Sequence, residues 1–225
     1  MLAYKVKIIF MDKLQSLYLP YLGGLGTSLK DIFLSESGGA ISLSVVADDN
    51  PVSSSAVPSV NPGLLSDVAA SRLKNDPEGP VTELGLIFAS TYYRDIGVVN
   101  PKWLGVMFDS DIVDGSEFFW SGPGKRPREC SAIFTSSIET FARNRGVSIE
   151  RVLARTAVHE LGHLFNLQHP NTGSFFMTQT GAIKDESTAY SRFSQADRLI
   201  LESIELPGYE YAKPGTQEFG RLFNT

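Results

Sequence analysis

Residues 159–169 read HELGHLFNLQH, and this stretch holds all three histidines of the 225-residue chain. His159 and His163 are four residues apart, so on a helix both imidazoles leave the same face and can bind one metal ion. His169 lies six residues further on and cannot share that face if the helix simply continues. The chain must therefore turn after about Phe165 to bring the third imidazole back. Three histidines at these spacings, with a glutamate after the first, arise by chance with a probability on the order of 10⁻⁵.

The turn requires a residue that tolerates a left-handed backbone, and Asn166 stands at this position. Asparagine is the next most tolerant residue after glycine for a positive φ. Three neutral imidazole nitrogens leave the fourth position of a Zn²⁺ ion open for water, which is typical of a catalytic site. Glu160 points across the metal and can pass a proton from the water to a leaving amine. Without the turn, the third ligand would have to be a downstream carboxylate such as Asp185 or Glu186.

The rest of the sequence predicts an α+β fold, with strands and a helix before the histidine segment and a last helix after it. Alternating or apolar runs predict strands, and apolar residues at helical spacing predict helices. Ser148 and Ser194 are natural N-caps for the two C-terminal helices. The Ser-, Pro- and Val-rich segment 52–63 reads as an exposed connection. Strands are expected at 4–10, 41–47, 84–90, 103–108 and 131–135, a short edge strand at 116–120, and helices at 64–74, 138–145, 148–168 and 195–205.

The pattern His159-Glu160-x-x-His163-x-x-Asn166-x-x-His169 resembles the metzincin consensus HExxHxxGxxH, with asparagine in the glycine position. This resemblance implies a metzincin or zincin-like fold: a twisted mixed sheet, an active-site helix, and a small C-terminal subdomain with a methionine turn and a final helix. It assigns Met177 to the hydrophobic floor of a zinc site. Residue 179 is a glutamine, so the tyrosine ligand of astacins and serralysins is not implied.

Two stretches resemble particular metzincin subfamilies. Residues 193–199 look like the start of the matrixin C-terminal helix, in which an aspartate matching Asp197 braces the methionine turn. Residues 104–120 are similar in order to archaemetzincins, which bind a second zinc through four cysteines after the third histidine. This chain has no cysteine there. The specific motifs cover about residues 104–205, and the subfamily stays open between archaemetzincin-like and matrixin-like.

Composition limits the other functions. The net charge is −5 and no basic block stands out, which argues against a nucleic-acid surface. No apolar run approaches the roughly 20 residues that a membrane span needs. The single cysteine, Cys130, excludes an intramolecular disulfide, and we interpret it as an inert thiol. The acidic run of Asp109, Asp111, Asp114 and Glu117 departs from the EF-hand pattern; we interpret it as a solvated loop, and Ca²⁺ binding stays open.

We therefore predict one catalytic domain over residues 1–225, with subdomains at 1–169 and 170–225. It would be a zinc-dependent endopeptidase that hydrolyses peptide bonds by Glu-assisted attack of a zinc-bound water. The alternatives are a zinc amidase and a non-proteolytic zinc-binding or interaction domain that keeps the fold. We expect a monomer with a peptide or protein substrate, and a pocket wall near 177–183. Lysines interrupt the apolar residues among the first ten, so this stretch does not form the core of a signal peptide. The localisation stays open between a cytoplasmic protein and one secreted after loss of an unseen leader.

Overall fold

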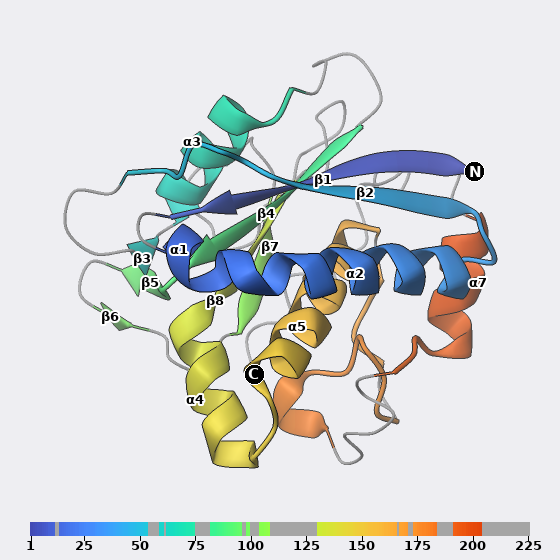
Figure 1. The fold of residues 1–225 in the computed structure, drawn as a ribbon. Coiled ribbons are helices and arrows are strands. Elements are labelled where there is room, and N and C mark those ends of the chain that lie inside the picture. The colour runs from blue at the N-terminus through green and yellow to red at the C-terminus, as the bar shows by residue number, and fades with distance from the viewer. Residues whose placement is uncertain are drawn as a thin grey trace.

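A five-stranded mixed sheet with the strand order β2-β1-β4-β8-β7 forms the centre of the molecule (Figure 1). The first four strands are parallel, and β7 runs antiparallel to β8. A second sheet of three short strands has the order β3-β5-β6.

The computed structural model describes residues 1–11, 14–53, 59–60, 62–74, 82–95, 98–99, 104–108, 130–165, 167–170, 173–183 and 191–203. The strands are β1 (Leu2–Phe10), β2 (Ile41–Ala47), β3 (Ser59–Val60), β4 (Glu83–Ala89), β5 (Thr91–Asp95), β6 (Val98–Val99), β7 (Gly105–Phe108) and β8 (Cys130–Phe134). The helices are α1 (Leu14–Tyr18), η1 (Leu19–Tyr21), α2 (Leu22–Glu36), α3 (Pro62–Arg72), α4 (Thr135–Arg145), α5 (Ile149–Leu164), η2 (Thr180–Ala182) and α7 (Gln195–Ser203).

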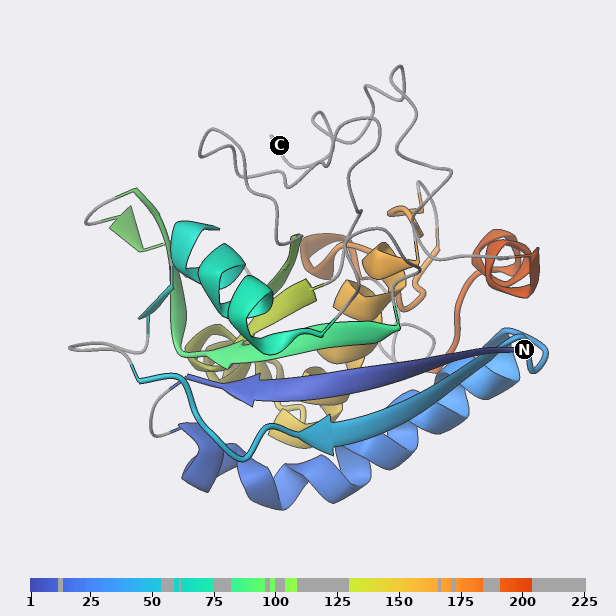
Figure 2. The same cartoon turned by 90° about the horizontal axis from the view of Figure 1, so that it is seen from above.

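Helices pack on both faces of the five-stranded sheet, because successive side chains of a strand point to opposite faces. The ring of Tyr4 on β1 lies 5.4 Å from the ring of Phe165, just after α5. The Nζ of Lys7 on the same strand donates to the carbonyl of Arg72 at the end of α3, at 2.6 Å. Helix α2 shares the face of α5, since the ring of Phe33 lies 5.2 Å from that of Phe165. Figure 2 shows α3 and α2 on opposite sides of the sheet. An aromatic core therefore holds α5 against one face.

Most elements around α5 were predicted from the sequence and are confirmed. Ser148 caps α5, where its side chain accepts a backbone N–H of the first turn at 3.3 Å. Ser194 caps α7, since its Oγ accepts the amide of Asp197 at 3.1 Å. The strand predicted at 41–47 is β2. Helix α5 ends at Leu164, earlier than the predicted bound of 168, and a turn begins at Phe165, where the return of His169 requires one. The sequence predicted an α+β fold with a mixed sheet, and the structure has such a sheet with helices packed on both faces.

Other predictions differ from the structure. No element was predicted at 14–36, where the chain forms α1, η1 and α2. The segment 52–63, predicted as an exposed connection, contains β3 and the first residues of α3. Strand β3 forms through parallel pairing with β5, a contact between distant segments that local composition does not reveal. The strand predicted at 103–108 is shorter, and the helix predicted at 138–145 begins earlier, at Thr135. The edge strand predicted at 116–120 lies outside the described residues.

Helix α2 exists because of what it buries. Leu25, Leu29 and Phe33 are spaced four residues apart and are all buried, so one face of the helix packs into the core. Helix α2 packs against β2 at Gly26, where a Cβ would lie in ordinary contact with the Cβ of Val45, at 3.4 Å. Within the part of the chain that the structure describes, no helix is long and apolar enough to cross a membrane.

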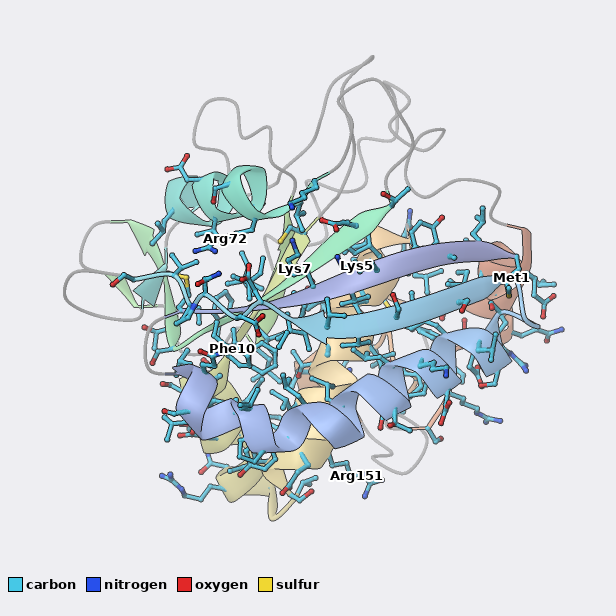
Figure 3. The ribbon with its side chains drawn as sticks, turned by 45° about the horizontal axis from the view of Figure 1, so that its top comes forward. Met1, Lys5, Lys7, Phe10, Arg72 and Arg151 are labelled. Atoms are coloured by element: carbon cyan, nitrogen blue, oxygen red, sulfur yellow. The ribbon has the colours of Figure 1, made fainter. Side chains whose placement is uncertain are left out.

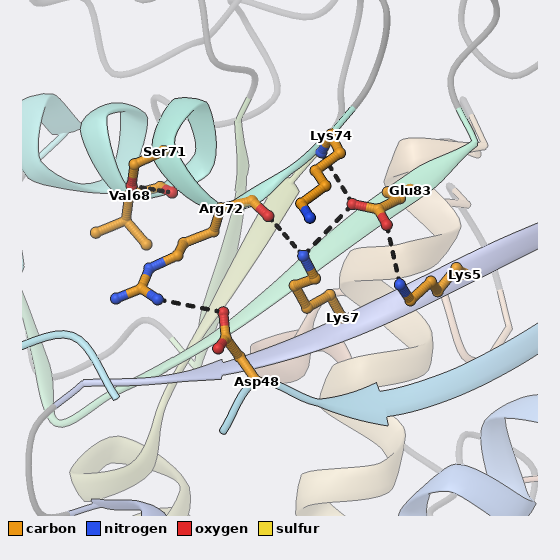
Figure 4. A network of polar contacts seen from close by, with 8 residues as sticks. All are labelled: Lys5, Lys7, Asp48, Val68, Ser71, Arg72, Lys74 and Glu83. Atoms are coloured by element: carbon orange, nitrogen blue, oxygen red, sulfur yellow. Dashed lines mark hydrogen bonds and ion pairs between the residues drawn. The ribbon is translucent and has the colours of Figure 1, made fainter. Parts of the chain in front are cut away.

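On the α3 face, the carboxylate of Glu83 links β1 and β4 to the residues just after α3 (Figure 4). The Nζ of Lys5 donates to its Oε1 at 3.0 Å, and the Nζ of Lys7 lies 3.5 Å from its Oε2. The same Oε2 accepts the amide of Lys74 at 2.9 Å. Burial raises the pKa of Glu83, but the Lys74 amide, the Lys5 hydrogen bond and the two lysine charges outweigh it, and the pKa is lowered. The ionised carboxylate therefore stabilises the fold.

We expect Glu83→Gln to lower the free energy of unfolding at neutral pH by about 1–3 kcal/mol, because an amide cannot replace these charge-assisted bonds. The folded-state pKa of Glu83 is below its unfolded value of about 4.3, so the contribution is present above that value and is lost as pH falls through the folded pKa. Urea unfolding of both proteins at neutral and strongly acidic pH measures the difference, which should shrink in acid. Equal stability at neutral pH would contradict the prediction.

Candidate metal centre

Three imidazoles converge at one point beside α5. His159 and His163 lie one helical turn apart on α5, and His169 returns from the segment that follows the helix. The Nε2 atoms are 3.1 Å apart for His159 and His169, and 3.2 Å apart for each of the two pairs that include His163. The structure thus brings together the three histidines that the sequence singled out, in an arrangement that could hold a metal ion.

The outer nitrogens of two rings fix which nitrogens face the centre. Nδ1 of His159 lies 2.7 Å from the carbonyl oxygen of Phe176, and Nδ1 of His163 lies 2.8 Å from that of Leu167. A carbonyl oxygen only accepts, so each Nδ1 carries the proton and each Nε2 presents a lone pair to the centre. Converging lone pairs repel one another unless a cation lies between them, so the donor set fits a metal ion.

The spacing also suits zinc. Zinc–nitrogen bonds are about 2.0–2.1 Å long, and two such bonds to nitrogens separated by 3.1–3.2 Å enclose an angle of about 100°. This angle is close to the tetrahedral value that zinc sites adopt. Three ligands of this geometry leave one coordination position open, as catalytic zinc sites do.

The surroundings favour the neutral form of two of the imidazoles, those of His159 and His169. Burial lowers the pKa of His159 well below its ordinary value, and the nearby His163, Arg155 and His169 add to the shift. Burial, with the charge of Arg155, lowers the pKa of His169 to about 4. Neutral imidazole is the form that binds a metal ion. At neutral pH these two histidines therefore do not have to lose a proton before a metal ion could bind.

The side chain of Glu160, on α5, lies against strand β7. It is 5% exposed, and burial raises its pKa to about 8 although the charge of Arg155 acts in the opposite direction. A metal cation beside the carboxylate would favour the ionised form. Its side chain packs directly on Gly105, where a Cβ would lie 2.6 Å from both Cγ and Oε1 of Glu160. The glutamate can occupy this position only because residue 105 has no side chain.

Met177 lies beneath the histidine-bearing turn of α5. It is fully buried, and its Sδ would be 2.5 Å from a Cβ on Gly162, the residue before His163. The sulfur therefore packs against the helix backbone between the two histidines. Its assignment as the floor of the site stays a prediction that this contact supports.

Arg155 is a residue of this region that the sequence did not single out. It lies on α5 one turn before His159 and is 2% exposed. Its guanidinium donates to the carbonyls of Phe176, at 3.3 Å, and of Thr178, and to Oγ1 of Thr180 at 3.4 Å. The sequence signal that could have identified Arg155 was its four-residue spacing from His159. This spacing places a cation on the same helix face as His159 and His163.

The remaining predicted residues are less directly placed. Asp197 is buried, and its Oδ2 accepts the backbone N–H of Ser194 at 3.1 Å and its hydroxyl at 2.7 Å. Burial raises the pKa of Asp197, and these bonds oppose the shift. Its role as a brace of the methionine turn stays a prediction.

Cys130 is buried against Gly85, where a Cβ would lie 2.2 Å from its Sγ. Asn166, the acidic run at 109–117 and the alternative ligands Asp185 and Glu186 lie outside the described residues.

Known proteins share the fold but little sequence. No protein-family model and no curated protein matches the chain. Archaemetzincin from Methanopyrus kandleri superposes with a TM-score of 0.50 at 17% identity, over 89% of this chain and 94% of that one. A zinc-dependent peptidase from Methanocorpusculum labreanum gives 0.46 at 12% identity, over 87% and 99%. Metalloproteinase-II from Bacteroides fragilis gives 0.49 at 17% identity, over 89% of this chain and 52% of that longer one. The match to archaemetzincin shows that this chain shares the mixed α/β fold of that protein.

Proposed function

We propose that this chain is a zinc-dependent endopeptidase of the metzincin type, with His159, His163 and His169 as zinc ligands and Glu160 as the general base. The observation that carries the proposal is the convergence of the three Nε2 atoms to within 3.1–3.2 Å of one another, with the buried Glu160 on the same helix. A structural zinc site needs a fourth protein ligand and has no use for this carboxylate.

In this mechanism each residue has one task. When bound, zinc supplies Lewis-acid polarisation of the scissile carbonyl and lowers the pKa of water. Ionised Glu160 accepts the proton of the attacking water and delivers it to the leaving amine. The carbonyls of Phe176 and Leu167 hold two imidazoles in the tautomer that presents Nε2.

The proposal also covers how a peptide would lie. Within the described chain, β7 is the last strand on its side of the five-stranded sheet, and Glu160 packs against it at Gly105. An extended peptide added alongside this edge would pass the base and the histidines. Residues 170–225 would form the second subdomain, with Met177 in a methionine turn and residues 177–183 in the pocket wall.

Metal analysis combined with a peptide-library cleavage profile tests this function. We expect about one zinc ion per chain and cleavage within extended peptides that chelators abolish and added zinc restores. Zinc binding without cleavage of any peptide in a broad library would favour the non-proteolytic zinc-binding domain. Release of ammonia or an amine from small amides instead would favour an amidase.

Gly105→Ala tests the position of the base. The added methyl group must push the Glu160 carboxylate aside, and displacement by about 1 Å can reduce turnover by about 10²-fold. We expect kcat to fall to this extent while zinc content is unchanged, as measured by steady-state kinetics and metal analysis.

Gly23→Ala is the matched control for this substitution. Gly23 lies on α2, and nothing lies within 4 Å of a Cβ placed there. Alanine should keep activity and stabilise the helix by about 0.5–1 kcal/mol. A Gly105→Ala enzyme as active as the Gly23→Ala enzyme would show that the contact with Glu160 has no role in catalysis.

A further inference from the structure

The carbonyl of Phe176 holds the ring of His159, yet it comes from a distant part of the chain. Residue 176 lies in a turn, 17 residues after the histidine. The matching acceptor for His163 is the carbonyl of Leu167, only four residues away, and the amide of Leu167 bonds to the carbonyl of Gly162 at 3.0 Å. The His163 acceptor is thus fixed by the end of α5 itself, whereas the His159 acceptor needs a separate tether.

Arg155 supplies that tether from the helix side. Its NH2 donates to the carbonyl of Phe176, the same oxygen that receives the Nδ1 proton of His159. The guanidinium also bonds to Thr178 and Thr180, so it holds the segment at three points. From the other side, the amide of Phe176 donates to the carbonyl of Arg192 at 2.9 Å.

We propose that Arg155 is a positioning residue of the histidine site: by holding the Phe176 carbonyl, it fixes the tautomer and orientation of the His159 ring before a metal ion arrives. This inference rests on the proposed zinc site, in which His159 is a ligand. It extends that site by one buried cation and by the segment 176–180, which also carries Met177. In this role Arg155 acts on the His159 ring through the carbonyl of Phe176.

The chemistry of arginine suits this task. The planar guanidinium has five donors in a fixed fork, so it can bond to two carbonyls and a hydroxyl at once. A lysine at this position would present a compact ammonium group that cannot span the same acceptors. Removal of a group that orients a metal ligand commonly costs 10–100-fold in metal affinity, and we expect about this loss when Arg155 is replaced.

The test compares Arg155→Met with Arg155→Lys and two controls. Arg151→Met removes an exposed arginine one turn earlier on the same helix (Figure 3). Val68→Ala creates a cavity under α3, on the opposite face of the sheet, and controls for a general loss of stability. Two quantities are measured: the zinc dissociation constant by competition with a chelator, and the ¹⁵N shifts of His159 in the metal-free protein, which report its tautomer.

We expect Arg155→Met to bind zinc about 10–100-fold more weakly and to lose the single Nδ1–H tautomer of His159. Arg155→Lys should fall between it and the parent, and both controls should match the parent. Parent-like affinity and tautomer in Arg155→Met would overturn the proposal, as would an equal loss of zinc affinity in Val68→Ala. If Arg155→Met does not fold, Arg155→Lys decides by the same two measurements.

The two proposals fail in different ways. A parent protein that binds zinc but cleaves no peptide contradicts the endopeptidase and leaves both Arg155 measurements in place. A parent that binds no zinc contradicts the zinc site, and the tautomer of His159 in the metal-free protein still decides whether Arg155 positions that ring.

Discussion

Replacing Glu160 with glutamine is expected to reduce peptide hydrolysis by about 10²–10⁴-fold, the range for loss of a general base, while zinc binding is retained. The amide has the same shape as the carboxylate and can pack against Gly105 in the same way, but it cannot accept a proton from water. The loss should appear in kcat, because the base acts in the transition state.

Burial makes the same substitution harmless to the fold. It raises the pKa of Glu160 to about 8 in the metal-free protein, well above the unfolded value of about 4.3. A carboxyl group whose pKa is raised in the folded state lowers the stability of that state above the unfolded pKa, because folding must then take up a proton or bury the charge. The metal-free Glu160→Gln protein should therefore be at least as stable as the parent near neutral pH, as thermal unfolding would show.

The matched control is Glu150→Gln, an exposed residue in the first turn of the same helix. It should keep activity, zinc content and melting temperature. If Glu160→Gln cleaves peptides as fast as this control, then Glu160 is not the base, and another group must activate the water. If it loses zinc together with activity, the carboxylate acts on the metal site and not on the proton.

The sequence predicted those parts of the fold that local signals specify. Strand β2 was predicted with its observed bounds because apolar residues alternate over 41–47 and a turn follows. Helix α2 was missed because Gly23, Gly24 and Gly26 are poor helix formers. Burial of Leu25, Leu29 and Phe33 overrides that preference, and it depends on a sheet that local propensity does not include.

The residues of the candidate site also divide into those that local sequence signals predict and those that depend on long-range packing. His159, Glu160 and His163 were predicted because helical spacing places them, and His169 was predicted because a turn after about Phe165 would bring its imidazole back to them. Gly105 was not predicted, because its contact with Glu160 joins strand β7 to a helix residue that lies 55 residues later in the sequence. Arg155 was not predicted as part of the site, because its partners lie in a turn distant in sequence. The position of that turn depends on the packing of Met177 and the segment around it. Long-range packing therefore contributes the supports, and local sequence contributes the reactive groups.

Removing any one of the three imidazoles is expected to weaken zinc binding by about 10²–10⁴-fold. Binding of zinc to protein sites yields about 10–16 kcal/mol, so each of three ligands accounts for about 3–5 kcal/mol. The described cluster holds these three histidines, and the sequence has no others to replace one of them. Zinc affinity measured by chelator competition should fall in His159→Ala, His163→Ala and His169→Ala alike. The rise in melting temperature that zinc produces in the parent should shrink with it, because a ligand stabilises the fold in proportion to its binding.

His169→Ala is the decisive variant, because His159 and His163 share α5 whereas His169 must be brought back by the chain. Gln168→Ala is its control, since it changes the same segment without touching a ligand, and it should bind zinc as the parent does. A parent-like zinc affinity in His169→Ala would mean that the convergence of its Nε2 atom with the others is not used for binding. The site would then be a two-histidine site with a third ligand from elsewhere, and Asp185→Ala and Glu186→Ala would be the variants that identify it.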